Sequence, residues 1–314
     1  MIEVQNLTKV YVDKRAVDNI SFFIKEGEIV GFLGPNGAGK TTTIRMLTGF
    51  LPPTEGKILI GGYEIGEKSL QARKLIGYMP ESAALYNELR VIEYLKFRGE
   101  LNKVPSKELK NNIDYILDAC FIKDVKDKII GNLSKGYRQR VALAGVLVHN
   151  PKVLILDEPT IGLDPVQIVK IRELIKEIGR ERTVFISTHI LPEAEMISDR
   201  VLVIDKGKIL AQDTPQNLKN TLKGNTIYEI QIKPPLKEIE EFRKIEGVIE
   251  IEKIKDTGEE LHLKITGEKN LDLREKIYDF LYEKKIKILG LTEKTLSMED
   301  VFLRLTMEEK EVVQ

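Results

Sequence analysis

The sequence predicts an α/β fold with a mainly parallel sheet, followed by a small α+β domain. Three strongly apolar runs, EIVGFL (28–33), VLILD (153–157) and TVFIST (183–188), are separated by segments of helical character. Runs that are apolar on both faces and alternate with helices are typical of a parallel sheet covered on both sides. Later in the chain the pattern changes to the order βαββαβ, that of a compact two-layer unit. We therefore expect one large domain over residues 1–222 and an accessory domain over 223–314.

The elements of the first domain follow from local patterns. Residues 2–24 alternate polar and apolar side chains with a turn near Asp13, which predicts half-exposed strands and an antiparallel β subdomain. After the run EIVGFL comes a glycine loop and then TTTIRMLTG, which predicts a helix that ends at Gly49. Residues 86–150 lose β character and predict a helical insert. Its helices are expected near 89–102, 106–122 and 137–149.

The accessory domain is read in the same way from its periodicity. Short runs of alternating or β-branched residues predict strands, and longer amphipathic runs predict helices. The strands are expected at 226–232, 248–254, 260–266 and 286–294, and the helices at 236–245 and 271–285.

Composition excludes several classes of protein. The chain has 49 basic and 49 acidic residues among 314, so its net charge gives no argument for a nucleic-acid partner, and none is expected. The single cysteine, Cys120, lies in an apolar run and is expected to be a buried hydrophobe rather than a nucleophile. No signal peptide is evident, and no window approaches the roughly 18 apolar residues of a membrane helix. A cytoplasmic location is expected, with any membrane role supplied by a partner.

The segment GPNGAGKTT matches the pattern G-x-x-x-x-G-K-[ST] between a predicted strand and a predicted helix. Glycines let consecutive backbone N–H groups face an anion, and the helix N-terminus adds partial positive charge. Lys40 is expected to reach the β- and γ-phosphates of a nucleotide, and the Thr41 hydroxyl to bind Mg²⁺. A glycine turn without a ligand is the alternative. The expected binding residues are Gly34, Pro35, Asn36, Gly37, Ala38, Gly39, Lys40, Thr41 and Thr42.

Two further strands end in polar residues. Asp157 and Glu158 follow a buried strand, at the edge where ligands lie in parallel sheets. Asp157 is expected to hold Mg²⁺ through water, and Glu158 to orient or deprotonate the attacking water. His189 follows the next apolar strand and is expected to contact the γ-phosphate. Solvated strand ends are the alternative for all three.

A second potential anion site begins at LSKGYRQR (133–140), where Ser134 and the backbone near Gly136 precede a helix. The phosphate loop already serves one anion, so a second site needs either a second anion or a second chain, and we expect the second chain. An ordinary serine cap on the helix is the alternative, because serine is a common N-cap.

Taken together, these segments resemble the ATP-binding subunits of ABC transporters over roughly residues 2–220. The resemblance implies ATP with Mg²⁺ and two chains, most simply identical, that pair head-to-tail around two nucleotides. It implies that Ser134 and Gly136 bind the nucleotide held by the other chain. It places Asp164, with Gly162 and Leu163, in a loop by which the two sites sense each other. Tyr11 falls where the family stacks an aromatic ring on adenine; packing on the core is the alternative.

Where the sequence departs from the family pattern, it resembles one subgroup of the family. The family's signature is LSGGQ, whereas this chain has Lys135 and Tyr137 in place of a glycine and the glutamine. Glu81 stands where the family has glutamine, and a role near Mg²⁺ is expected for it. With the accessory domain, these features resemble the ABC-2-type export ATPases, including those of gliding motility, copper-site assembly and drug or sodium efflux.

The resemblance implies that a separate transmembrane permease holds the ATPase at the inner face of the cell membrane. Leu85, Tyr86 and Leu89 are candidates to contact it, with burial in the core as the alternative. Two other functions are the alternatives. A soluble mechanical ATPase on ribosomes or DNA would show two ATPase units or a coiled-coil arm. A small-molecule kinase would leave the signature and the GLD loop (162–164) unexplained.

Overall fold

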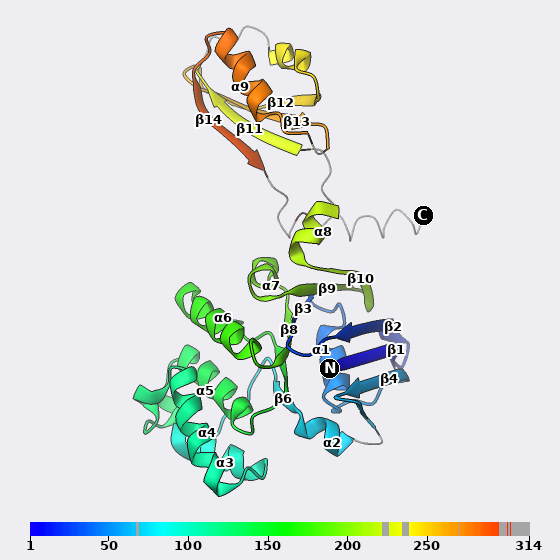
Figure 1. Cartoon of the computed structure of the whole chain (residues 1–314), viewed down its shortest axis with the longest axis vertical. Coiled ribbons are helices and arrows are strands. Elements are labelled where there is room, and N and C mark those ends of the chain that lie inside the picture. Colours follow the sequence, from blue (N-terminus) through cyan, green and yellow to red (C-terminus); the bar gives the residue numbers. More distant parts are fainter. Residues whose placement is uncertain are drawn as a thin grey trace. The chain divides into compact units, whose positions relative to one another are not determined.

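The structure, a computed structural model, describes residues 1–66, 69–221, 226–233, 239–269, 271–294, 300 and 302. The chain divides into two compact units, Met1–Pro215 and Gln216–Gln314 (Figure 1). The boundary expected after residue 222 lies outside the described residues and stays a prediction. Among the described residues, no helix combines the length and the apolar character that crossing a bilayer requires.

The central layer of the first unit is a six-stranded sheet. Five strands run parallel and only β10, at one edge, pairs antiparallel with its neighbour β9. The three apolar runs of the sequence form β3, β7 and β8, as predicted, and every residue of these strands is buried. In sheet order the strands are β10 (Lys208–Asp213), β9 (Arg200–Asp205), β3 (Ile29–Leu33), β8 (Thr183–Thr188), β7 (Val153–Asp157) and β6 (Ile76–Met79).

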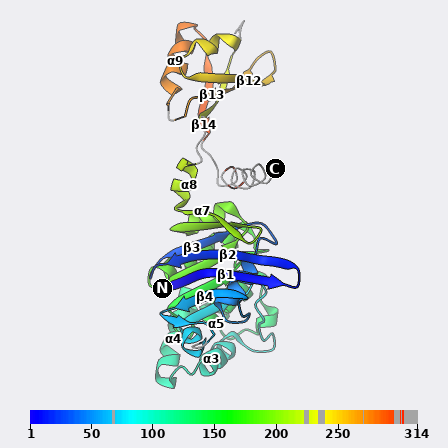
Figure 2. The same ribbon diagram turned by 90° about the vertical axis from the view of Figure 1, so that its right-hand side faces the viewer.

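The first face of the central sheet packs on helix α1 (Lys40–Leu47) and on a second, antiparallel sheet. Figure 2 shows β1, β2 and β4 of that sheet side by side. The predicted turn near Asp13 separates β1 from β2, because β2 begins at Lys14. The antiparallel strands are β2 (Lys14–Ile24), β1 (Ile2–Tyr11), β4 (Glu55–Ile60) and β5 (Tyr63–Glu64), and α2 (Ser69–Lys74) follows them.

The second face of the central sheet packs on helices, because side chains alternate between the faces of a strand. Val153 and Ile155 join the cluster under the antiparallel sheet, whereas Leu154 and Leu156 join the helical cluster. The predicted insert forms α3 (Val91–Leu101), α4 (Ser106–Ala119) and α5 (Lys135–Leu147), with 3-10 turns at Lys123–Val125 and Ile130–Asn132. Also in this unit are α6 (Pro165–Gly179) and α7 (Leu191–Ile197), and α8 (Pro215–Thr221) spans the division.

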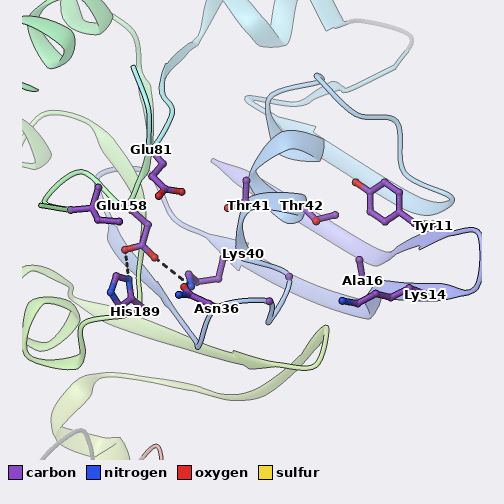
Figure 3. A pocket seen from close by; sticks show the side chains of 13 residues that line it. Tyr11, Lys14, Ala16, Asn36, Lys40, Thr41, Thr42, Glu81, Glu158 and His189 are labelled. Carbon is purple, nitrogen blue, oxygen red and sulfur yellow. Dashed lines mark hydrogen bonds and ion pairs between the residues drawn. The ribbon is translucent and has the colours of Figure 1, made fainter. Parts of the chain in front are cut away.

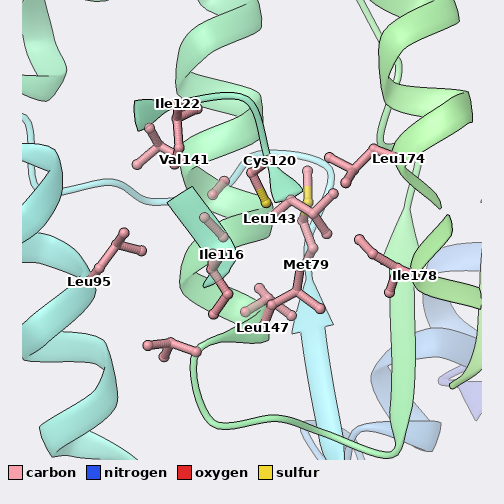
Figure 4. Packing of buried hydrophobic residues seen from close by; sticks show 14 of the residues in the cluster. Met79, Leu95, Ile116, Cys120, Ile122, Val141, Leu143, Leu147, Leu174 and Ile178 are labelled. Carbon is pink, nitrogen blue, oxygen red and sulfur yellow. The ribbon is translucent and has the colours of Figure 1, made fainter. Parts of the chain in front are cut away.

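Cys120 lies inside the helical cluster, beside Ile116 and Leu143 (Figure 4). Its side chain is fully buried, and burial raises the pKa of the thiol to about 12. A thiol that stays protonated is a poor nucleophile, so Cys120 packs as a hydrophobe, as the sequence predicted.

The second unit has the predicted order βαββαβ, with one difference. Its four strands form an antiparallel sheet in the order β12-β13-β11-β14. The first helix was expected over 236–245; its described part is a 3-10 helix, and residues 236–238 lie outside the described residues. Within the 3-10 helix Phe242 is the buried residue, and Ile245, directly after it, is 8% exposed. The elements are β11 (Thr226–Ile232), η3 (Ile239–Lys244), β12 (Val248–Asp256), β13 (Leu261–Gly267), α9 (Arg274–Glu283) and β14 (Ile288–Lys294).

Candidate functional site

The glycine loop connects β3 to α1 and carries Lys40 as the first residue of the helix. Gly39 has φ +110, and a Cβ there would lie 2.6 Å from the Ala16 carbonyl oxygen, so no other residue fits without strain. The Lys40 side chain is 6% exposed, and its Nζ donates to the carbonyl oxygens of Gly34 at 2.8 Å and Pro35 at 3.2 Å. The ammonium is therefore held in place within the loop.

Asp157 ends β7 directly beside this loop. The Ser187 hydroxyl donates to Asp157 Oδ1 at 2.5 Å, and the Thr41 side chain also forms a hydrogen bond with the carboxylate. Burial raises the pKa of Asp157, although these two hydrogen bonds act in the opposite direction. A hydroxyl and a carboxylate are oxygen ligands of the kind that Mg²⁺ prefers, so this pair fits the expected cation.

Glu158 contacts both Lys40 and His189, which lie far from each other in the sequence (Figure 3). Its Oε1 lies 3.3 Å from Lys40 Nζ, and its Oε2 lies 2.7 Å from His189 Nδ1. The backbone of Glu158 has φ +49, and its N–H donates to the Ser187 hydroxyl at 3.0 Å. The ends of β7, of β8 and of the glycine loop therefore converge on one carboxylate.

These groups open onto a cavity of about 410 Å³, here called the site cavity. Tyr11 lines it and is 41% exposed, so this ring is not part of the core; stacking on adenine stays a prediction. Glu81 also lines it, from an exposed loop after β6. The lining residues are Tyr11, Lys14, Ala16, Asn36, Gly37, Gly39, Lys40, Thr41, Thr42, Glu81, Glu158, Ile161 and His189.

Three lining residues were missed by the sequence analysis. Lys14 and Ala16 come from β2, and Ile161 comes from the turn after β7. Ile161 lies three residues after Glu158, and this closeness in the sequence could have suggested it as a site residue. Lys14 and Ala16 belong to no motif, and only the folding of β2 against the loop brings them here.

Seven predicted residues do not line the site cavity. Gly34, Pro35 and Ala38 belong to the glycine loop and Asp157 ends β7, whereas Ser134, Gly136 and Asp164 lie at the starts of α5 and α6. Ser134 caps α5 and accepts a hydrogen bond from the Tyr137 N–H at 3.4 Å. Asp164 caps α6 and accepts from the Gln167 N–H at 2.9 Å. A Cβ on Gly136 would lie 2.2 Å from Gln167 Oε1, so the starts of α5 and α6 are in close contact. Ser134 therefore caps a helix, as the alternative reading expected, and its contact with a nucleotide stays a prediction.

The candidate contacts for a permease divide into two kinds. Leu85 and Leu89 are partly buried and pack against the helical cluster, so they belong largely to the core. Tyr86 is 50% exposed, and its ring meets that of Phe97 edge-on at 5.3 Å between centroids. Tyr86 is therefore the surface residue of the three.

Comparison with known proteins agrees with this geometry. A model of the family described as ABC transporter matches residues 17–161, and one described as ATP-binding protein DrrA1-3-like, C-terminal domain, matches residues 214–306. The chain is 37% identical to an uncharacterized ABC transporter ATP-binding protein, YhcH of Bacillus subtilis, over 100% of this chain and 98% of that protein. It is 36% identical to the bacitracin transport ATP-binding protein BcrA of Bacillus licheniformis, over 97% of each. It is 34% identical to the Nod factor export ATP-binding protein I of Neorhizobium galegae, over 99% of this chain and 86% of that protein.

Solved structures show the same fold. The ATP binding subunit of an ABC transporter matches with a TM-score of 0.64 and 29% identity, over 70% of this chain and 92% of that one. A dimeric, post-hydrolysis ATP-binding cassette, MJ0796, bound to ADP and Pi, matches with a TM-score of 0.62 and 26% identity, over 68% and 98%.

The fold and the site define a nucleotide-hydrolysing cassette. The chain belongs to the ATP-binding proteins of ABC transporters, and its accessory unit is of the DrrA-like kind. It is the ATP-binding and ATP-hydrolysing subunit of an ABC transporter. The soluble mechanical ATPase and the small-molecule kinase are therefore set aside.

Proposed function

We propose that two copies of this chain close on two Mg-ATP molecules and drive a separate transmembrane permease of the ABC-2 type. The single observation that carries the shared site is the position of Ser134 and Gly136, which lie outside the site cavity of their own chain at the start of a helix. A helix N-terminus suits an anion, and the nucleotide of a second copy supplies one. The solved dimeric cassette MJ0796 supports this pairing.

Within each copy, the roles follow from the geometry. Lys40, the loop backbone and Thr42 bind the phosphates, and Tyr11 packs on the base. Thr41 and Asp157 hold Mg²⁺, which supplies charge stabilisation to the phosphates, and Glu81 faces the same region. Glu158 accepts the proton of the attacking water, and His189 positions its carboxylate through the 2.7 Å contact. Ser134, Gly136 and Asp164 act on the site of the other copy.

The permease is proposed to hold the cassette at the inner face of the cell membrane, and no nucleic-acid partner is proposed. A second cavity, of about 340 Å³, supports a docking place near residues 81–100, because it lies between the central sheet and α3. Phe50, Tyr78 and Tyr94 give it apolar walls. The named substrates of the relatives differ, bacitracin in one and Nod factor in another, so the proposal leaves the cargo open.

Sedimentation of Glu158→Gln protein with and without Mg-ATP tests the shared site. Slow hydrolysis traps the closed form, so we expect ATP-dependent dimers that Ser134→Arg abolishes. Ser106→Arg is a matched control, because Ser106 is also exposed in the first turn of a helix, α4. Dimers that persist in Ser134→Arg, or a protein that binds ATP and stays monomeric, would contradict the proposal.

A further inference from the structure

Glu193 is a buried carboxylate that the proposed function does not use. It lies in α7 and is 1% exposed. Its Oε2 accepts two hydrogen bonds, from the Thr160 hydroxyl at 2.7 Å and from the Thr188 hydroxyl at 3.2 Å. Its Oε1 is buried and has no hydrogen-bond partner in the part of the chain that the structure describes. A buried carboxylate with one unsatisfied oxygen opposes folding, so stability alone does not account for this residue.

The two threonines flank the groups that act on ATP. Thr160 follows Glu158 by two residues, and Thr188 directly precedes His189. Both threonines are at most 2% exposed. The Thr188 hydroxyl also accepts a hydrogen bond from the Ile190 N–H at 3.0 Å, so it joins the chain on either side of His189. One oxygen of Glu193 therefore ties together the two segments that carry the base and the histidine.

The conformation of Glu158 requires such a constraint. A φ of +49 is strained for a residue with a side chain, and strained residues persist only where their surroundings fix them. Before the strained residue, the Ser187 hydroxyl fixes β7 by its bonds to Asp157 and to the Glu158 N–H. After it, the bond from Thr160 to Glu193 is the hydrogen bond that fixes the turn to α7.

We infer that Glu193 is a positioning residue for ATP hydrolysis, which holds Glu158 against His189 by binding Thr160 and Thr188 through one oxygen. The inference rests on the proposed roles of Glu158 and His189. Glu193 does not line the site cavity, so it acts through these neighbours and not on the nucleotide. Displacing a reacting group by about 1 Å can slow a reaction about 100-fold without changing how substrate binds.

Steady-state ATP hydrolysis and equilibrium ATP binding of the full chain test this inference. For Glu193→Ala we expect kcat to fall about 10- to 100-fold, while the affinity for ATP stays within about twofold. Glu193→Gln keeps an oxygen that can accept both hydrogen bonds, so it should retain most of the activity. Thr160→Val removes one of the two bonds and should lower kcat in the same way. Combined with Glu193→Ala, it should add little, because the two changes break one interaction.

Controls separate positioning from folding. Ser198→Ala removes another buried oxygen that has no partner among the described residues, at the end of α7, and should leave kcat unchanged. Full activity of Glu193→Ala and Thr160→Val overturns the inference. So does an equal loss in Glu193→Gln and Glu193→Ala, or a loss of ATP affinity parallel to a lower thermal midpoint. Glu158→Gln and His189→Ala are measured alongside: if these two keep the wild-type rate, the proposed function has failed, and not the inference alone.

Discussion

At the scale of single residues, the site depends on charges that the fold holds in place before any ligand arrives. Lys40 is anchored by two backbone carbonyls, and Glu158 is held between Lys40 and His189. A left-handed backbone at Glu158 costs about 1–3 kcal/mol, which the neighbouring strands must offset. Groups fixed in this way need little reorganisation during reaction, and such preorganisation favours the transition state.

Glu158→Gln should therefore separate binding from hydrolysis. The amide keeps the size of the side chain but cannot accept a proton from water, so we expect phosphate release to slow about 10²- to 10⁴-fold. ATP binding should remain, because Lys40 and the loop are unchanged. Glu181→Gln, at an exposed carboxylate after α6, is the control and should behave as wild type. Hydrolysis at the wild-type rate in Glu158→Gln would assign the base elsewhere.

Gly39→Ala tests the fit of the loop. The new Cβ would meet the Ala16 carbonyl at 2.6 Å and would force a side chain to φ +110, so we expect a loss of stability of about 1–3 kcal/mol or more. Gly62→Ala isolates the backbone effect, since Gly62 has φ +81 with nothing within 4 Å of its Cβ position. Urea unfolding measures both variants. Equal losses would show that the contact with Ala16 contributes nothing.

At the scale of elements, the sequence predicted the helices, strands and loops that are marked by a local pattern of residues. Glycine spacing predicted the loop and α1, and the buried runs predicted β3, β7 and β8 as strands of one mainly parallel sheet. Glu193 was not found, because a single acidic residue in a short helix gives no local sign that it will be buried. Lys14 reaches the site cavity only through the pairing of β2 with β1, which depends on the whole sheet. Contacts between distant segments are what the sequence did not reveal.

His149 joins two elements and should make stability depend on pH. Its Nε2 lies 3.1 Å from the Ile76 carbonyl oxygen, which links the end of α5 to β6. Burial lowers the pKa of His149, so the unfolded chain takes up a proton at a higher pH than the folded chain does. The contribution of neutral, buried His149 to the free energy of unfolding is complete above about pH 6.5. It is lost as the pH falls towards the pKa of His149 in the folded chain.

Denaturant unfolding between pH 7.5 and 5 measures this contribution. We expect the free energy of unfolding of the wild type to fall across this range, and His149→Gln to show a shallower fall. His262→Gln, which changes a histidine of the second unit in the same way, is the matched control. If the free energy of unfolding falls with pH equally steeply in His149→Gln and in the wild type, His149 is not the cause of the pH dependence.

At the scale of the whole molecule, the hydrophobic cores of the two units share no residues. Two buried clusters lie on the two faces of the central sheet and share its strands. A third cluster, which includes Tyr228 and Phe242, draws its members only from the second unit. The Tyr228 hydroxyl donates to the Leu271 carbonyl and accepts from the Leu273 N–H, so its polar atom is satisfied within that unit. Each unit therefore has the means to unfold as its own cooperative step.

Differential scanning calorimetry of the full chain should resolve these two steps. The proposed ATP site is built from residues of the first unit, so Mg-ATP at about 100 times its dissociation constant should stabilise that unit by about 2.7 kcal/mol and leave the other transition in place. Phe242→Ala should destabilise the second unit by about 3–5 kcal/mol, since this ring is fully buried, and Phe185→Ala should do the same to the first. Two transitions that respond to different variants would show that the accessory unit is energetically independent in the isolated chain. A single transition that both ATP and Phe242→Ala shift would mean that the second unit is coupled to the nucleotide, because only coupled units transmit stabilisation from one to the other.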